Sequence, residues 1–401
     1  MQRRTFIAAS AAVVAARPAG AAEPHVLPGD DVFVAETWRE LAGRTIGIVT
    51  NQSGVLSNGT TLVDAVRANP QIRVKALFAP EHGLRGDRDA GTYVASYTDA
   101  RTGLPVYSLY GDTRHPSARM LDGIDVLVFD IQDVGARPYT FASTLAFVME
   151  SARQYGKEIW VLDRPNPIGG VRVEGPVLDP AYKSFIGLYP IPERHGLTIG
   201  ELAQLFNGHF AIGAKLRVIA LRGWSREMLW ADTNLRWTPT SPNVPYAFTP
   251  LVYLATGLID EGGVNNGVGT DRPFEYAGGY GFNAAAFART LTARAIPGAR
   301  FEPLEWVPQR GFWAGKTLAG VQIHVDDPHA FPNVRTAVEL LAAARAQSRL
   351  HIAKAANFDR DWGTDTVRLA LLGGASPDEI VASWESGLST FRAVRERYLL
   401  Y

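Results

Sequence analysis

Four apolar runs in the first half of the chain each lead into a polar side chain. They are TIGIVT before Asn51, VKALFAP before Glu81, IDVLVFD ending at Asp130 and EIWVLD ending at Asp163. Runs of this length between helical patterns are typical of buried parallel strands. In open α/β sheets the ligand crevice lies beyond the carboxyl ends of the strands. The pattern therefore predicts one polar site at that edge, and with it an enzyme.

The hydrophobic periodicity extends these runs into an alternating series of strands and helices, which is typical of an α/β fold. Strands are predicted at residues 44–50, 72–78, 105–110, 124–130, 158–162, 216–220 and 320–325. Helices are predicted at residues 31–41, 61–67, 143–155, 202–207, 284–293 and 336–346. Ser376 and Glu379 form a capping box that starts one further helix. The apolar face of that helix would consist of Val381, Trp384, Leu388 and Phe391.

A stretch rich in Trp and Pro, residues 224–250, interrupts this series. At 401 residues the chain is too long for one ordinary core, so two domains are expected. We place the first domain at residues 25–246 and a smaller α+β domain at residues 247–401, where fewer strands end in polar residues.

Composition excludes several classes of function. The 40 Lys and Arg residues balance the 40 Asp and Glu residues, which argues against a nucleic-acid partner. The chain has no cysteine, so disulfides, iron–sulfur clusters and thiolate zinc sites are excluded. No G-x-G-x-x-G motif follows the first strand, so no dinucleotide is expected. We predict no cofactor of any other kind.

The N-terminus has the pattern of a targeting segment. Arg3 and Arg4 precede an apolar run that reaches Ala16, and Ala19-Gly20-Ala21 offers a small-residue cleavage site. The arginine pair resembles a twin-arginine signal, and the run is too short to serve as a stable membrane anchor. We therefore predict a signal peptide at residues 1–21 and export to the periplasm.

Three clusters of polar residues lie in loops that follow the predicted strands. They are Glu81, His82 and Arg85; then Asp130, Gln132, Asp133 and Arg137; then Asp163, Arg164, Asn166 and Glu174. The glycines and prolines of these loops allow tight folding against a ligand with little entropy to lose. Each cluster also has an alternative interpretation: solvated surface charge for the first and third, and a helix cap for Asp130.

Arg194 and His195 lie just before a helix that a capping box of Thr198 and Glu201 begins. A helix N-terminus with cationic side chains nearby favours an anion; the alternative is that His195 only packs on its loop. A metal ion is not predicted, because the sequence has no HExxH motif, EF-hand loop or paired histidines. The candidate ligands for one would be His82, Asp87, Asp130, Asp133 and His195.

Eight segments carry a resemblance to a known family. They are TNQSG (50–54), APEHGLRGD (79–87), RTGLPVYSLYG (101–111), VLVFDIQDVGARPYT (126–140), LDRPNPIGG (162–170), VEGP (173–176), RHGLTIGEL (194–202) and SPNVP (241–245). In this order they resemble the bacterial exo-β-N-acetylmuramidases of peptidoglycan recycling. The resemblance implies a Rossmann-like catalytic domain followed by a smaller auxiliary domain. It also implies release of N-acetylmuramic acid from the non-reducing ends of muropeptides or disaccharides.

The same resemblance assigns roles to residues of this chain. PEHG and VEGP place the catalytic carboxylates at Glu81 and Glu174, and glycoside hydrolysis commonly uses such a pair. Our own candidates for substrate binding are Asn51, His82, Arg85, Asp130, Gln132, Asp133, Arg137, Tyr139, Asp163, Arg164, Asn166, Arg194, His195 and Asn243.

N-acetylmuramic acid carries a lactyl carboxylate, which calls for a positively charged pocket. The candidates for bidentate contact with it are Arg85, Arg137, Arg164 and Arg194. One segment departs from the family pattern. Where members commonly have FEGTN followed by GRGT, this chain has IDEGGVNNGVGT, which keeps acidic residues at Asp260 and Glu261 but has Val268 in place of arginine.

Two other functions fit the sequence. A metal-dependent hydrolase or esterase of the cell envelope would use the His and Asp side chains, and would lose activity to a chelator. A periplasmic muropeptide-binding protein would share the two-domain plan and bind without turnover. The density of carboxylates on loops fixed by Pro and Gly argues against simple binding, because buried unpaired charge is costly and marks functional sites.

Overall fold

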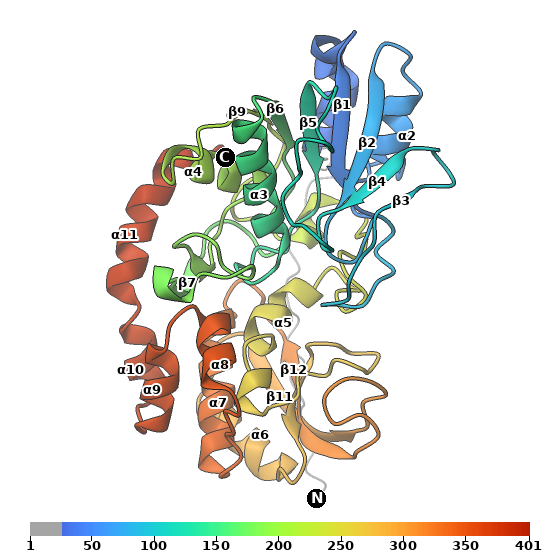
Figure 1. Ribbon diagram of the computed structural model, residues 1–401. Coiled ribbons are helices and arrows are strands. Elements are labelled where there is room, and N and C mark those ends of the chain that lie inside the picture. Colours follow the sequence, from blue (N-terminus) through green and yellow to red (C-terminus); the bar gives the residue numbers. More distant parts are fainter. Residues whose placement is uncertain (1–25) are drawn as a thin grey trace, which may run out of the picture.

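The computed structural model describes residues 26–401, so the predicted signal peptide lies outside the described residues. A seven-stranded sheet forms the centre of the first domain (Figure 1). Its strands are β1 (Thr45–Thr50), β2 (Arg73–Ala79), β3 (Tyr97–Thr98), β4 (Pro105–Ser108), β5 (Val126–Asp130), β6 (Glu158–Leu162) and β9 (Lys215–Ile219). The order is β3-β4-β2-β1-β5-β6-β9, and every neighbouring pair is parallel except β3 with β4. The predicted α/β class is confirmed.

The sheet brings the four polar strand ends to one edge. Strands β2, β1, β5 and β6 are direct neighbours, so Glu81, Asn51, Asp130 and Asp163 follow one another along their carboxyl ends. The direction in which strands are added reverses between β1 and β5, which makes this the switch point where open α/β sheets form a crevice.

Helices cover both faces of the sheet because its strands are apolar on both sides. One face packs on α3 (Phe141–Gln154) and α4 (Ile199–Gly208). The other packs on α2 (Leu62–Arg67) and on the helical segment that starts with α1 (Gly29–Val32). That segment was predicted as one helix, but it changes from α-helix to a π-helical turn at Phe33–Thr37 and then to a 3₁₀ turn.

The second domain contains a three-stranded antiparallel sheet with helices on one side (Figure 1). Its strands are β10 (Tyr276–Gly279), β11 (Ala299–Trp306) and β12 (Leu318–Val325), in the order β10-β12-β11. Its helices are α5 (Thr249–Thr256), α6 (Ala284–Ala293), α7 (Asn333–Ala346), α8 (Ala355–Trp362), α9 (Thr366–Leu372), α10 (Pro377–Ala382) and α11 (Glu385–Arg395). A short ribbon of β7 (Glu174–Val177) and β8 (Pro192–Arg194) lies between the domains (Figure 1).

The single helix predicted after Ser376 is wrong, because the chain forms α10 and α11 there. The Ser383 hydroxyl donates to the Ile380 carbonyl at 2.6 Å and competes with the helical hydrogen bonds at the break. Trp384, Leu388 and Phe391 are nevertheless buried as the pattern predicts. No helix within residues 26–401 is long and apolar enough to cross a membrane.

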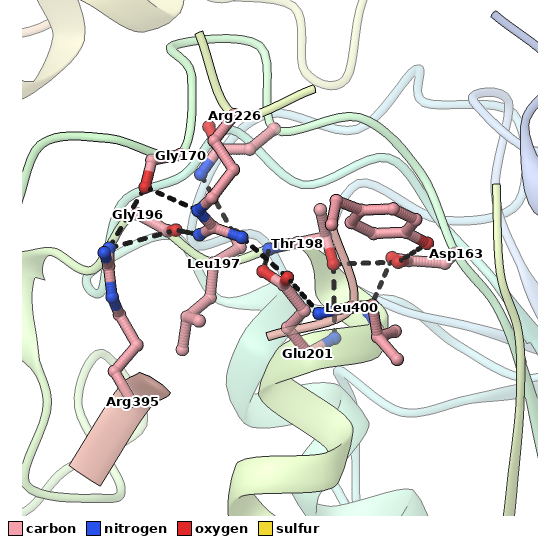
Figure 2. Close-up of polar contacts among 12 residues, drawn as sticks. Asp163, Gly170, Gly196, Leu197, Thr198, Glu201, Arg226, Arg395 and Leu400 are labelled. Atoms are coloured by element: carbon pink, nitrogen blue, oxygen red, sulfur yellow. Dashed lines mark hydrogen bonds and ion pairs between the residues drawn. The ribbon is translucent and has the colours of Figure 1, made fainter. Parts of the chain in front are cut away.

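The C-terminal segment returns from α11 to the first domain, as Figure 1 shows. Figure 2 shows Arg395 donating to the carbonyls of Gly170 and Gly196, and the Leu400 amide donating to Glu201. The hydroxyl of Tyr401 donates to Asp163 at 2.7 Å. The last residues of the second domain therefore fasten onto the first domain, beside the ends of β6 and β9.

Candidate active site

Glu81 is held at the end of β2 by donors from two different loops. Its side chain is almost fully buried. Oε1 accepts a hydrogen bond from the Gly91 amide at 2.8 Å, and Oε2 accepts one from the Thr140 hydroxyl at 2.7 Å. The next residue, His82, adopts a φ of 69°, a conformation that is uncommon for any residue but glycine. The His82 ring contacts the Arg88 carbonyl at 2.8 Å, which supports this turn.

Three tyrosines lie near enough to Glu81 to feel its charge. Burial raises the pKa of Tyr110, Tyr139 and Tyr253, and the charge of Glu81 raises each of them further. Tyr139 and Tyr253 pack edge to face, with ring centroids 5.7 Å apart. Because Tyr253 lies on α5 of the second domain, Glu81 lies where the domains meet. Aromatic faces and hydroxyl groups together suit a sugar ring.

The switch point holds a buried ion-pair network. Arg164 donates to Asp130 and to Asp30, both at 2.6 Å. Burial raises the pKa of Asp30 to about 8, which Arg164 partly offsets. A cavity of about 350 Å³ lies beside this network and is lined in part by Gln132, Arg164 and Trp237. Asn51 turns inward and accepts hydrogen bonds from the Ser53 amide and hydroxyl.

Asp163 and Asn166 hold the loop around α4. Asp163 accepts from the Thr198 hydroxyl at 2.8 Å and the Gly200 amide at 2.7 Å, at the start of α4. Burial raises the pKa of Asp163 to about 7. Asn166 donates to the Leu197 carbonyl at 2.9 Å. These contacts give both residues a structural role that the strand-end pattern alone does not predict.

His195 and Asp133 are buried next to each other. The Nδ1 atom of His195 accepts from the Leu197 amide at 3.1 Å, and its Nε2 atom lies 3.9 Å from Asp133. Burial lowers the pKa of His195 to about 3, with Arg395 and Arg194 adding to the effect. Burial also raises the pKa of Asp133 to about 7. The imidazole is therefore neutral at physiological pH.

Both carboxylate oxygens of Glu174 accept hydrogen bonds from the protein. It pairs with Arg194 across β7 and β8, and Oε1 accepts from the guanidinium at 2.8 Å. Oε2 accepts from the Val334 amide at 3.1 Å, at the start of α7. Arg194 also donates to Asn333 at 2.6 Å. The hydrogen-bond partners of Glu174 and of Glu81 have no residue in common.

The arginines predicted to bind the lactyl carboxylate all have protein partners. Arg137 is fully buried between the domains, where it pairs with Glu193 and donates to the Asp361 carbonyl at 3.0 Å. Arg164 and Arg194 are buried in the networks described above. Arg85 is partly exposed and pairs with Asp99 at 2.8 Å.

Asn243 lies at the surface between the domains. Its side-chain oxygen accepts a hydrogen bond at 3.0 Å from Arg310, which belongs to the second domain. Among residues 26–401, no three His, Asp or Glu side chains gather closely enough to hold a metal ion. The metal-dependent alternative gains no support from this part of the chain.

Comparison with known proteins assigns the chain to a family. The family models described as "Exo-beta-N-acetylmuramidase NamZ", N-terminal and C-terminal, match residues 46–247 and 251–401. The chain belongs to the NamZ family. It is 41% identical over 383 residues to the "Peptidoglycan beta-N-acetylmuramidase NamZ" of Bacillus subtilis, which covers 95% of this chain and 92% of that protein.

Two crystal structures of DUF1343 family proteins from Bacteroides fragilis share the fold. The first has a TM-score of 0.89 and 34% identity, and the second has a TM-score of 0.75 and 30% identity. Each comparison covers 94% of this chain and 99% of the other. The two-domain NamZ architecture predicted from the sequence is confirmed.

The segment that departs from the NamZ pattern lies in the second domain. Asp260 is exposed in the 3₁₀ turn Asp260–Gly262, which contacts α8, and Glu261 accepts from Asn357 on α8 at 3.1 Å. Val268 packs against the apolar core. The acidic pair of this NamZ protein therefore contacts α8.

Sequence reasoning missed Tyr110, Thr140 and Tyr253 around Glu81. Tyr110 and Thr140 each end one of the strings that resemble the family or lie next to its end, so that signal was available for them. No local signal exists for Tyr253, because the fold of the NamZ second domain carries it to Glu81.

Proposed function

We propose that this protein is an exo-acting glycoside hydrolase that releases N-acetylmuramic acid from the non-reducing ends of peptidoglycan fragments. The observation that carries the proposal is the 41% identity, over 95% of the chain, to a peptidoglycan β-N-acetylmuramidase. The substrates would be muropeptides or disaccharides. The position of Glu81 between the two domains and near three tyrosines supports this proposed function.

Glu81 is the proposed general acid. It would protonate the glycosidic oxygen as the bond to the leaving sugar breaks, which leaves an oxocarbenium-like sugar to be attacked. The amide of Gly91 and the hydroxyl of Thr140 fix both carboxylate oxygens and so orient the group. Burial of the Glu81 side chain limits its contact with water, which strengthens electrostatic contacts with the transition state.

Glu174 is the proposed second carboxylate. As a nucleophile or as the base for a water molecule it would complete the pair that glycosidases commonly use. Its present contacts with Arg194 and Val334 place it at the junction of β7 and α7. In some families the substrate's own acetamido oxygen takes this part, and substitution of Glu174 separates the two mechanisms.

The function is tested by incubating the purified protein with a disaccharide that has N-acetylmuramic acid at its non-reducing end. We expect free N-acetylmuramic acid to appear with time in chromatography, and a disaccharide ending in N-acetylglucosamine to be left largely intact. Binding without release would support the muropeptide-binding alternative. Loss of activity after treatment with a chelator would support the metal-dependent alternative.

We propose in addition that the protein is exported to the periplasm by way of the Arg3-Arg4 segment. Mass spectrometry of the protein from the periplasmic fraction should find a mature N-terminus near Ala22. A variant with Lys at both positions should remain in the cytosol if the twin-arginine route is used. Recovery of an intact Met1 form from the cytosol alone would contradict export.

A further inference from the structure

An arginine of the second domain contacts the loop that binds one carboxylate oxygen of Glu81. The Glu81 carboxylate accepts a hydrogen bond from the Gly91 amide. Two residues earlier in this loop, Asp89 accepts one from Nη1 of Arg310 at 3.0 Å. Two residues span at most about 7 Å, so Arg310 is close to the loop that holds Glu81.

The same arginine is connected to the other carboxylate oxygen of Glu81 by a longer chain of contacts. Thr140 donates to the second carboxylate oxygen, and its neighbour Tyr139 contacts the Thr240 hydroxyl at 2.6 Å. Three residues after Thr240, the Asn243 side chain accepts from Nη2 of Arg310 at 3.0 Å. A continuous chain of contacts through Arg310 therefore links the two carboxylate oxygens of Glu81 and crosses between the domains.

The ion pair of Arg310 with Asp89 is exposed to solvent, so a ligand carboxylate can compete with Asp89 for the guanidinium. The two side chains are 51% and 72% exposed, and exposed pairs contribute little stability. The side chains of Arg137, Arg164 and Arg194 are at most 4% exposed, and freeing a buried cation from its partners is strongly unfavourable. A carboxylate on a ligand can therefore replace Asp89 on Arg310 far more easily than it can replace the partners of the other three.

The segment that departs from the family pattern positions Arg310. The Gln309 amide donates to the Gly269 carbonyl at 2.8 Å. A Cβ atom at Gly269 would lie 2.2 Å from the Arg310 carbonyl oxygen, and the φ of Gly269 is 94°. Only glycine allows so close an approach in this conformation. The backbone around Val268 therefore supports the loop that presents the guanidinium.

We propose that Arg310 binds the lactyl carboxylate of N-acetylmuramic acid and so sets the preference for this sugar. The inference rests on the function proposed above. In the free enzyme Asp89 occupies the guanidinium, and the substrate carboxylate takes its place on binding, while Asn243 keeps the side chain in position. The fork of the guanidinium fits a carboxylate in bidentate geometry.

The experiment compares two variants that break the same ion pair from opposite sides. The binding of N-acetylmuramic acid and of N-acetylglucosamine is measured by calorimetry in a Glu81→Gln background, which is not turned over. For Arg310→Gln we expect about 10- to 100-fold weaker binding of N-acetylmuramic acid, the range for a lost hydrogen bond between charged groups, and unchanged binding of N-acetylglucosamine. For Asp89→Asn we expect equal or tighter binding of N-acetylmuramic acid, because the competing carboxylate is gone.

Two further variants serve as comparisons. Arg300→Gln removes a similarly exposed arginine of the second domain, paired with exposed carboxylates, and should leave both affinities unchanged. Arg114→Gln removes the arginine that packs on Tyr110 and Phe185, and should also leave the preference intact. The proposal is overturned if Arg114→Gln, and not Arg310→Gln, weakens the binding of N-acetylmuramic acid. It is also overturned if Asp89→Asn weakens the binding of both sugars as much as Arg310→Gln does. Failure of the wild-type enzyme to release N-acetylmuramic acid would refute the proposed function instead.

Discussion

Replacing Glu81 with glutamine should lower the release of N-acetylmuramic acid by at least about a hundredfold, the usual scale of acid–base assistance. Glutamine keeps the shape of the side chain and still accepts from Thr140 or Gly91, but it cannot donate the proton that the leaving sugar needs. Turnover and sugar binding are measured separately. We expect kcat to fall while the affinity for N-acetylmuramic acid stays within a few-fold of the wild type.

Two other glutamates make this result specific. Glu174→Gln should show a comparable loss with little change in melting temperature if the two carboxylates act as a pair. A lowered melting temperature with normal turnover per folded molecule would instead assign Glu174 to the contact with α7. Glu385→Gln, at an exposed pair with Arg392, is the control for loss of a surface carboxylate. Near-normal turnover in Glu81→Gln would move the acid elsewhere, with Asp130 the next candidate.

Replacing Arg137 with methionine should lower the free energy of unfolding by about 3–5 kcal/mol, the usual result of removing one partner of a buried ion pair. Methionine fills most of the volume but leaves Glu193 buried without its cation. The guanidinium also donates to the Asp361 carbonyl at the end of α8, so the contact between the domains is lost as well. Chemical denaturation measures the change.

The loss of stability in Arg137→Met should depend on pH. Burial raises the pKa of Glu193 to about 7 from an ordinary value of 4.5, and Arg137 opposes the rise. A carboxyl group whose pKa is raised in the folded state contributes stability at low pH and loses it as the pH rises through that value. Without Arg137 the pKa of Glu193 rises further, so Arg137→Met should be more destabilising at pH 8 than at pH 5.

A second substitution and a surface pair control this prediction. Adding Glu193→Leu to Arg137→Met should restore most of the lost stability, because no uncompensated charge remains buried. Arg217→Met breaks the largely exposed pair with Glu40 and should have a much smaller effect. Equal losses in Arg137→Met and Arg217→Met would show that the buried pair does not stabilise the fold as proposed.

The elements could be predicted where local pattern alone decides them. Strand β6 and helix α6 begin and end at the predicted residues, because alternation of apolar runs and the 3.6-residue period are properties of short segments. The break between α10 and α11 was missed, since both sides of it keep one apolar face. At the break the amide of Trp384 bonds to the Val381 carbonyl in a tighter turn, and the Ser383 hydroxyl bonds to the Ile380 carbonyl.

The sequence by itself determined the α/β class, the two-domain plan, the family and the placement of Glu81 at a strand end. Each of these depends on patterns or motifs that are continuous along the chain. Only the tertiary structure decided which charged side chains are available to bind a ligand. Arg137 and Arg164 are neutralised by Glu193, Asp30 and Asp130, whereas Arg310 shares an exposed pair with Asp89, 221 residues away in the chain. Burial and pairing depend on partners distant in sequence, and no local pattern records them.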